Sequence, residues 1–217
     1  LDLRVQGVKF RVHRPSSIVK LGVLGAGLFA NATLLPALKK IPDIELVGIA
    51  SAVGLHAQHS AKKFGFAYAT SSDDEIINDP RITTVAILTR HDSHSELTVK
   101  ALQAGKHVFV EKPLAIDERG LDKVIAALTI DHGLQTETNC SSSTVHGLLT
   151  VGFNRRFAPL AVVLSKFLST RHEPLYMHYR VNAGYIPLNH WTHDPAQGGG
   201  RVIGEGCHFV DFLAFLS

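Results

Sequence analysis

A short apolar run followed by two closely spaced glycines constrains the fold of this chain most. Residues 18–24 are mainly apolar, and Gly25, Gly27 and Ala30 then complete a G-x-G-x-x-A pattern that opens a helix-like segment reaching residue 38. The first glycine allows a tight turn, the second lets the backbone approach a pyrophosphate, and the helix N-terminus favours a phosphate. A plain structural turn is the alternative. We predict a dinucleotide site with contacts from Gly25, Ala26, Gly27, Leu28 and Phe29.

Apolar and helix-like segments alternate beyond this turn. We predict strands at 45–50, 67–69, 84–88, 106–110 and 148–153, with helices at 55–64, 71–79, 93–104 and 117–128. Strands that are apolar on both faces and joined by helices predict an α/β fold, a doubly wound parallel sheet of the Rossmann type. Ser93 and Glu96 have the spacing of a capping box, and Gly105 suits the end of that helix. The polar stretch 131–146 is predicted to be a loop.

The pattern changes in the last quarter of the chain. Residues 176–182 alternate as in a half-exposed antiparallel strand, and residues 201–216 have the pattern of a helix. One strand and one helix cannot form an independent sheet. We therefore expect an N-terminal extension or linker at 1–17, a Rossmann domain at 18–157, and the start of an incomplete α+β substrate domain at 158–217.

Composition excludes several classes of protein. The 217 residues are 45% hydrophobic and 19% charged, with a net charge of +3 and no run of five Lys or Arg residues, so nucleic acid is not an expected partner. No apolar stretch reaches the roughly 18 residues of a membrane span. Two cysteines make no disulfide framework. We expect a cytoplasmic protein with no membrane partner.

Lys112 lies just after the apolar run at residues 107–110, between Glu111 and Pro113. A lysine there lies at the carboxyl end of a buried strand, where open α/β sheets place their chemistry. The alternative is a surface lysine paired with Glu111. The surrounding motifs favour a catalytic role.

Four segments, at residues 25–30, 105–114, 151–157 and 198–211, follow one another as in the Gfo/Idh/MocA (glucose-fructose oxidoreductase/inositol dehydrogenase) family, which the chain resembles from residue 18 to 217. The resemblance implies a nicotinamide-dependent oxidoreductase with a Rossmann domain and a second αβ domain. Members act on pyranoses, inositols or nucleotide sugars, and commonly form homo-oligomers. Residues 182–185 and 190–195 resemble members linked to polysaccharide and nucleotide-sugar metabolism, some of which are parts of longer fused chains.

Oxidation of a secondary alcohol needs a base for the hydroxyl proton and a stabiliser for the charge that develops on oxygen. Lys112 suits the second role. His208 suits the first, since imidazole titrates near neutrality; a core histidine bonded to a backbone carbonyl is the alternative. Asp211 would share a helical face with His208 and orient it, or act only at the surface or as a cap.

One residue departs from the family pattern. An aspartate usually stands four residues before this histidine, and here that position is Gly204. Glu205, three residues before His208, would share its face of a regular helix. We expect Glu205 to orient His208 or to bind substrate.

The cofactor is expected to be NAD or NADP. Ser51 follows the second strand, where NAD sites usually have an acid and NADP sites have a nearby arginine. This chain has neither residue there, and we expect a slight preference for NAD. The resemblance places Thr89 and His91 at the nicotinamide half, with His94 close by and Glu111 beside Lys112. Helix capping and loop packing are the alternative for both histidines.

Substrate contacts are expected from four residues, each with a structural alternative. Arg155 is a candidate cation, or a solvated residue at a helix start. Tyr185, His190 and Trp191 would hold a sugar ring by stacking and hydrogen bonds, or pack as a lid on the first domain. No metal is expected at His190, because its neighbourhood lacks a convincing third and fourth ligand. Cys207 is expected to pack.

Two other functions remain open at this stage. A chain that lacks most of the second sheet could serve as a non-catalytic dinucleotide-binding or regulatory module. Within the family, a redox-assisted glycoside hydrolase would recycle a tightly held cofactor. Net production of reduced cofactor with sugar would exclude that reaction.

Overall fold

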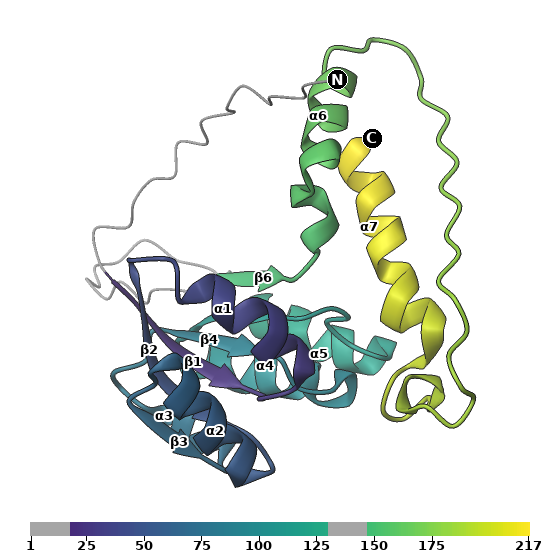
Figure 1. Cartoon of the computed structure of the whole chain (residues 1–217). Helices are drawn as coiled ribbons and strands as arrows, with labels where there is room; N and C mark the ends of the chain where they lie inside the picture. The colour runs from purple at the N-terminus through teal and green to yellow at the C-terminus, as the bar shows by residue number, and fades with distance from the viewer. Residues whose placement is uncertain (1–17, 130–146) are drawn as a thin grey trace, which may run out of the picture.

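One parallel sheet organises the part of the chain that the computed structural model describes, residues 18–129 and 147–217 (Figure 1). The expected extension at 1–17 and loop at 131–146 lie outside these residues. The strand order is β3-β2-β1-β4-β5-β6, which confirms the doubly wound α/β class. The strands are β1 (Val19–Leu24), β2 (Ile44–Ala50), β3 (Tyr68–Thr70), β4 (Thr84–Ile87), β5 (His107–Val110) and β6 (Leu149–Val151). The order reverses between β1 and β4, so ligands are expected at the carboxyl ends of these strands.

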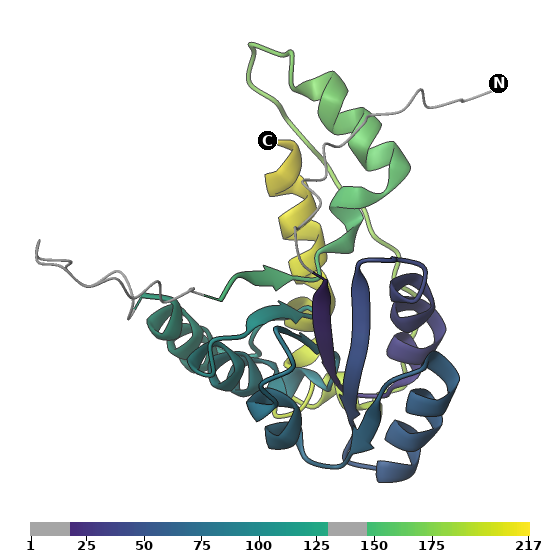
Figure 2. The ribbon, with the colours of Figure 1, turned by 90° about the vertical axis from the view of Figure 1, so that its left-hand side faces the viewer.

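Helices cover both faces of the sheet (Figure 2). Side chains of β1 alternate between two buried clusters, so that Val23 packs with α1 and α2, and Leu24 packs with α3 and α4. Burial on both faces explains why the strands are almost continuously apolar. The helices are α1 (Leu35–Leu38), α2 (Gly54–Phe64), α3 (Asp73–Asn78), α4 (His94–Gln103) and α5 (Glu118–Thr129). The helix after the glycine turn begins at Leu28 and contains a π-helical stretch, Ala30–Leu34, before α1.

Two further helices, α6 (Pro159–Leu168) and α7 (Cys207–Leu216), lie side by side and extend away from the sheet (Figure 1). The predicted helix at 201–216 is confirmed, although Val202–Gly206 is π-helical. The predicted strand at 176–182 is wrong, because these residues pair with no strand and Tyr176 is 88% exposed. An extended segment forms a strand only when a neighbour accepts and donates its backbone hydrogen bonds. The described residues offer it no such neighbour.

The start of α4 differs from the expected capping box. Ser93 ends a 3₁₀ turn, His91–Ser93, and its Oγ donates to the Arg90 carbonyl at 2.9 Å. Glu96 instead approaches Lys100 at 3.4 Å on the same helix. Ser93 has helical backbone angles, with φ of −92° and ψ of −10°, whereas a capping residue is normally extended, so its hydroxyl caps no N–H of α4. Gly105, with φ of +70°, follows the helix as expected.

Among residues 18–129 and 147–217, no helix is long and apolar enough to cross a membrane.

Candidate active site

The glycine turn after β1 forms an open cradle at the carboxyl edge of the sheet. Gly25 has φ of +103°, and a Cβ there would lie 2.6 Å from the Leu88 carbonyl oxygen, so the turn requires glycine. The Asn31 side-chain amide braces the turn by donating to the carbonyls of Ala26 and Gly27 at 2.8 and 3.0 Å. A Cβ on Gly27 would meet nothing within 4 Å, which leaves its backbone accessible. These residues fit a dinucleotide pyrophosphate.

The residues around the cradle that were expected to touch a cofactor differ in exposure. Leu28 is 86% exposed and Phe29 41% exposed at the start of the helix. Ser51 follows β2 at the same edge and is half-buried, with its backbone N–H donated to the Thr70 carbonyl at 3.2 Å. This hydrogen bond fixes the backbone that carries the Ser51 hydroxyl. The sequence places neither an acid nor an arginine next to Ser51.

Lys112 lies at the carboxyl edge, two residues after β5. Its Nζ donates to the carbonyl oxygen of Gly204 at 2.7 Å, which joins the sheet to the helical segment before α7. Glu111 packs against Gly152, and burial raises the pKa of its carboxyl group. The acceptor that holds the Lys112 ammonium is the neutral carbonyl of Gly204, which leaves the positive charge of the lysine in place.

Close packing accounts for the glycine at position 204. It is buried, and a Cβ on it would lie 3.1 Å from Cε1 of His91. A side chain here would require His91 or the helical segment to shift by a few tenths of an ångström. The departure from the family pattern therefore coincides with a close approach of two segments more than ninety residues apart in sequence.

His208, in the first turn of α7, is the second group of the site. It is 9% exposed, it meets the Phe153 ring edge-on at 6.0 Å between centroids, and its Nδ1 is buried without a hydrogen-bond partner. Burial, and then the charges of Lys112 and Arg155, lower the pKa of His208 to about 4. Buried polar atoms are rarely unpaired, so this nitrogen is a candidate for a functional contact. The imidazole is neutral near pH 7 and can accept a proton.

Neither carboxylate expected to orient His208 does so in this structure. Asp211 is buried, and both of its oxygens accept from the guanidinium of Arg156, one of them from Nε at 2.8 Å. Glu205 accepts from Arg201 at 3.0 Å. The π-helical stretch before α7 has more residues per turn than an α-helix, so Glu205 and His208 no longer share a face. Asp211 lies on the same regular helix as His208, but its carboxylate is engaged by Arg156. Both orienting predictions are wrong, and substrate binding by Glu205 stays a prediction.

The histidines near Thr89 have structural roles. His94 is fully buried, with Nδ1 2.7 Å from the Pro113 carbonyl and Nε2 3.2 Å from that of Thr89, so its predicted contact with a cofactor is wrong here. Burial lowers its pKa, and a neutral ring donates to only one of the two carbonyls. His91 Nδ1 lies 2.9 Å from the Gly198 carbonyl, and burial lowers its pKa as well. Thr89 Oγ1 lies 2.6 Å from Ser93 Oγ.

The expected substrate residues divide into two groups. Trp191 meets His91 edge-on at 4.9 Å between ring centroids and lies under the Arg90 guanidinium. These contacts agree with the alternative in which Trp191 packs on the first domain, because its ring face is not open to a sugar. Arg155 lies over Phe209 at 4.9 Å and donates to the Tyr179 hydroxyl at 3.2 Å, close enough to His208 to lower its pKa. Tyr185, which is 82% exposed, and His190, whose Nδ1 lies 3.0 Å from the Thr192 hydroxyl, remain predictions.

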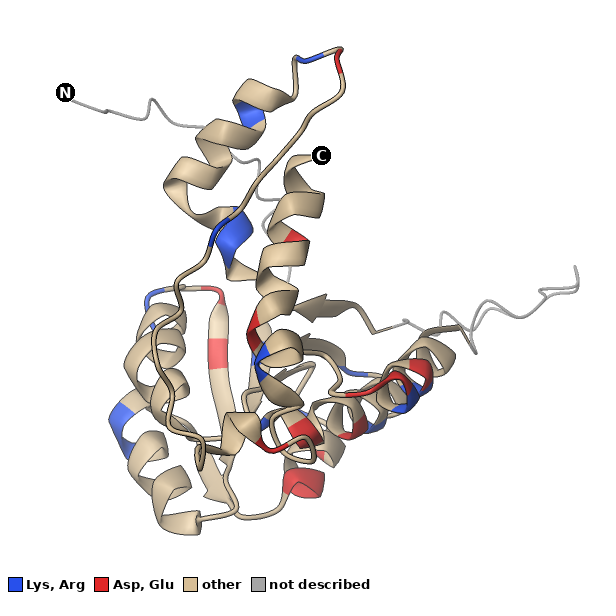
Figure 3. Ribbon diagram, turned by 90° about the vertical axis from the view of Figure 1, so that its right-hand side faces the viewer, with Lys and Arg blue, Asp and Glu red and all other residues tan. Residues whose placement is uncertain are grey.

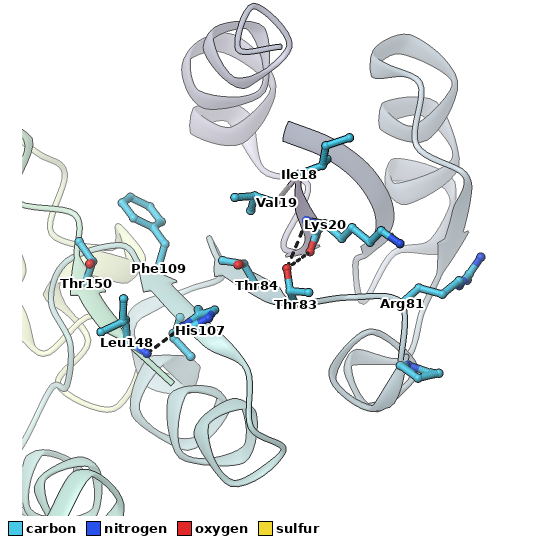
Figure 4. Close-up of a pocket in the computed structure, with 12 residues that line it drawn as sticks. Ile18, Val19, Lys20, Arg81, Thr83, Thr84, His107, Phe109, Leu148 and Thr150 are labelled. Atoms are coloured by element: carbon cyan, nitrogen blue, oxygen red, sulfur yellow. Dashed lines mark hydrogen bonds between the residues drawn. The ribbon is translucent and has the colours of Figure 1, made fainter. Parts of the chain in front are cut away.

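Cavities occur at both edges of the sheet. One of about 750 Å³ lies at the amino ends of the strands, where Val19, Thr84 and His107 begin β1, β4 and β5 (Figure 4). It is therefore on the edge opposite Lys112. Another, of about 880 Å³, lies between residues 113–118 and α7, and Cys207 lines it with a pKa raised by burial. Within the described ranges, no group of three or more possible ligands could hold a metal ion.

A third cavity, of about 630 Å³, adjoins the glycine turn and involves two residues that the sequence reasoning missed. His56 and His59 line it from α2. The lack of any acid between residues 46 and 72 was the sequence signal that would have drawn attention to them.

The parallel sheet and its glycine turn define the Rossmann class of dinucleotide-binding domain. Residues 19–135, more than half of the chain, match the GFO_IDH_MocA family model, described as "Oxidoreductase family, NAD-binding Rossmann fold". The chain belongs to the Gfo/Idh/MocA oxidoreductase family.

Individual relatives agree with this membership. The inositol 2-dehydrogenase of Salmonella typhimurium (strain LT2) is 27% identical over 173 residues, which are 78% of this chain and 48% of that protein. Among solved structures, an NAD-binding protein from Listeria innocua has a TM-score of 0.72 at 26% identity, covering 92% of this chain and 55% of that one. KijD10, a 3-ketoreductase from Actinomadura kijaniata in complex with NADP and TDP-benzene, shares the fold, with a TM-score of 0.66, 22% identity and coverage of 88% and 55%. The chain spans about half the length of these relatives.

Proposed function

We propose that this chain belongs to an NAD(P)-dependent dehydrogenase or reductase that acts on a secondary alcohol of a sugar, nucleotide sugar or cyclitol. The observation that carries the proposal is the convergence of Lys112 and His208 at the carboxyl edge that also holds the glycine turn. Relatives of this chain are named as an inositol 2-dehydrogenase and a 1,5-anhydro-D-fructose reductase, which supports the substrate class.

The two side chains divide the chemistry in this proposal. His208 is kept neutral by burial and by nearby cations, so it can take the proton of a substrate hydroxyl. The ammonium of Lys112, which the Gly204 carbonyl holds without neutralising it, donates to the same oxygen and stabilises the charge that develops there. The dinucleotide supplies hydride acceptance or donation when bound. The glycine turn holds its pyrophosphate through free backbone N–H groups.

The domain division at 157/158 is part of the same proposal. The described residues after 157 contain helices and extended segments but no strand. Contacts that join them to the first domain include Lys112 to Gly204, His91 to Gly198, and Arg156 to Asp211. Such contacts would place a substrate domain over the carboxyl edge and shield the site from water.

The test is a substrate screen with the intact protein. Cyclitols, free sugars and nucleotide sugars are each incubated with NAD and with NADP, and reduced cofactor is followed by its absorbance. We expect net reduction with at least one of these classes. Absence of turnover in both directions with all three classes, from protein that binds cofactor, would contradict the proposal and favour a binding module.

A further inference from the structure

Polar side chains line one side of the cavity of about 630 Å³ beside the glycine turn. Ser60, which is 1% exposed, donates to Asn31 Oδ1 at 2.8 Å, while the amide of Asn31 braces the turn. Ser60, Asn31 and the carbonyls of the glycine turn are therefore hydrogen bonded to one another. His56 and His59 are exposed on the side of α2 that lines the same cavity, so their ring nitrogens are the polar atoms free to meet a ligand.

Among the residues that the structure describes, no acidic residue lines this cavity. Between Glu45 and Asp73 the chain contains no acidic residue, and α2 carries Lys62 and Lys63 but no acid in its first turn (Figure 3). A dinucleotide whose pyrophosphate lies on the glycine turn places its adenosine ribose at the end of the second strand, here Ala50. The carboxylate that selects a 2′-hydroxyl there, and repels a 2′-phosphate, is missing from this stretch.

We propose that the cavity between the glycine turn and α2 receives the 2′-phosphate of NADP, with the imidazoles of His56 and His59 as its contacts. This inference rests on the proposed function, because it takes a nicotinamide dinucleotide to occupy the turn. Imidazole N–H groups donate to phosphate oxygens, and two donors one helical turn apart can share one phosphate. The inference opposes the preference for NAD that Ser51 suggested.

The test compares dissociation constants of the intact protein for NADPH, NADH, 2′,5′-ADP and 5′-AMP, measured by fluorescence or calorimetry. Wild type should bind NADPH and 2′,5′-ADP more tightly than NADH and 5′-AMP respectively. Replacing both histidines, His56→Ala with His59→Ala, should weaken NADPH and 2′,5′-ADP about 10–100-fold and change NADH less than about twofold. His56→Glu alone should lower the ratio of NADPH to NADH affinity further, because its carboxylate repels the phosphate.

His172→Ala, an exposed histidine outside this cavity, is the matched control and should change no constant. Equal weakening of NADPH and NADH in the double variant, or an unchanged ratio, would overturn the inference and leave the proposed function standing. Failure of wild type to bind either dinucleotide would overturn both. Because both histidines are exposed, equal thermal melts for variants and wild type are expected and show that folding is unaffected.

Discussion

The neutral state of His208 predicts a specific loss of stability in acid. In the folded protein its pKa is about 4, against 6.5 for an ordinary imidazole, so between these pH values the unfolded chain binds a proton that the folded chain does not. Stability therefore falls as the pH drops from 6.5 towards 4. One pKa unit equals about 1.36 kcal/mol, so the full effect would be about 3.4 kcal/mol. Solvent screening of the neighbouring charges reduces the expected loss to ~1.5–2 kcal/mol.

Urea unfolding at pH 7.5 and pH 4.5 measures this loss. The comparison is between wild type and His208→Gln, with His172→Gln as the exposed control. His91 and His94 shift in the same direction, so only the difference between wild type and the His208 variant isolates this group. We expect the variant to lose ~1.5–2 kcal/mol less than wild type over this interval. Identical losses would refute a buried, neutral His208.

Two further substitutions test the frame of the site. Gly25→Ala should destabilise the protein by at least ~2 kcal/mol and abolish cofactor binding, because its Cβ would lie 2.6 Å from the Leu88 carbonyl oxygen at a positive φ. Denaturant unfolding and cofactor titration measure the two effects. A stable variant that binds cofactor would contradict the geometry of the turn. Asp211→Asn should cost ~1–2 kcal/mol, since Asp211 is buried while Arg156 is partly solvated. Full stability of this variant in the same unfolding assay would show that the ion pair does not tie α7 to residues 154–157.

Local patterns in the sequence predicted the parts of the fold that depend on neighbours along the chain. The glycine turn and the buried strands follow from residues a few positions apart, and they are found where expected. The strand at 176–182 was misjudged because a strand depends on a partner elsewhere, and alternation alone does not supply one. The capping box failed because Ser93 belongs to the turn before the helix and has helical rather than extended backbone angles.

The site was harder to predict because its contacts join distant segments. The expected helical spacing of Glu205 and His208 assumed a regular α-helix, and the π-helical stretch Val202–Gly206 changed it. The partner of Asp211 is 55 positions away, and spacing within one helix cannot reveal that partner. Lys112 was found from its place at a strand end, whereas its acceptor, the Gly204 carbonyl, is a backbone group that residue type does not disclose.

The rate of hydride transfer in a single turnover, with Lys112→Met, tests the central claim most directly. The intact enzyme is loaded with cofactor and mixed with the substrate that the screen identifies. Lys123→Met, an exposed lysine on α5, serves as the control. We predict a fall of about 10²–10³-fold in the Lys112 variant with cofactor affinity unchanged within about twofold. Hydride transfer within a few-fold of wild type, with normal cofactor binding, would contradict the role of Lys112 in stabilising the reacting oxygen.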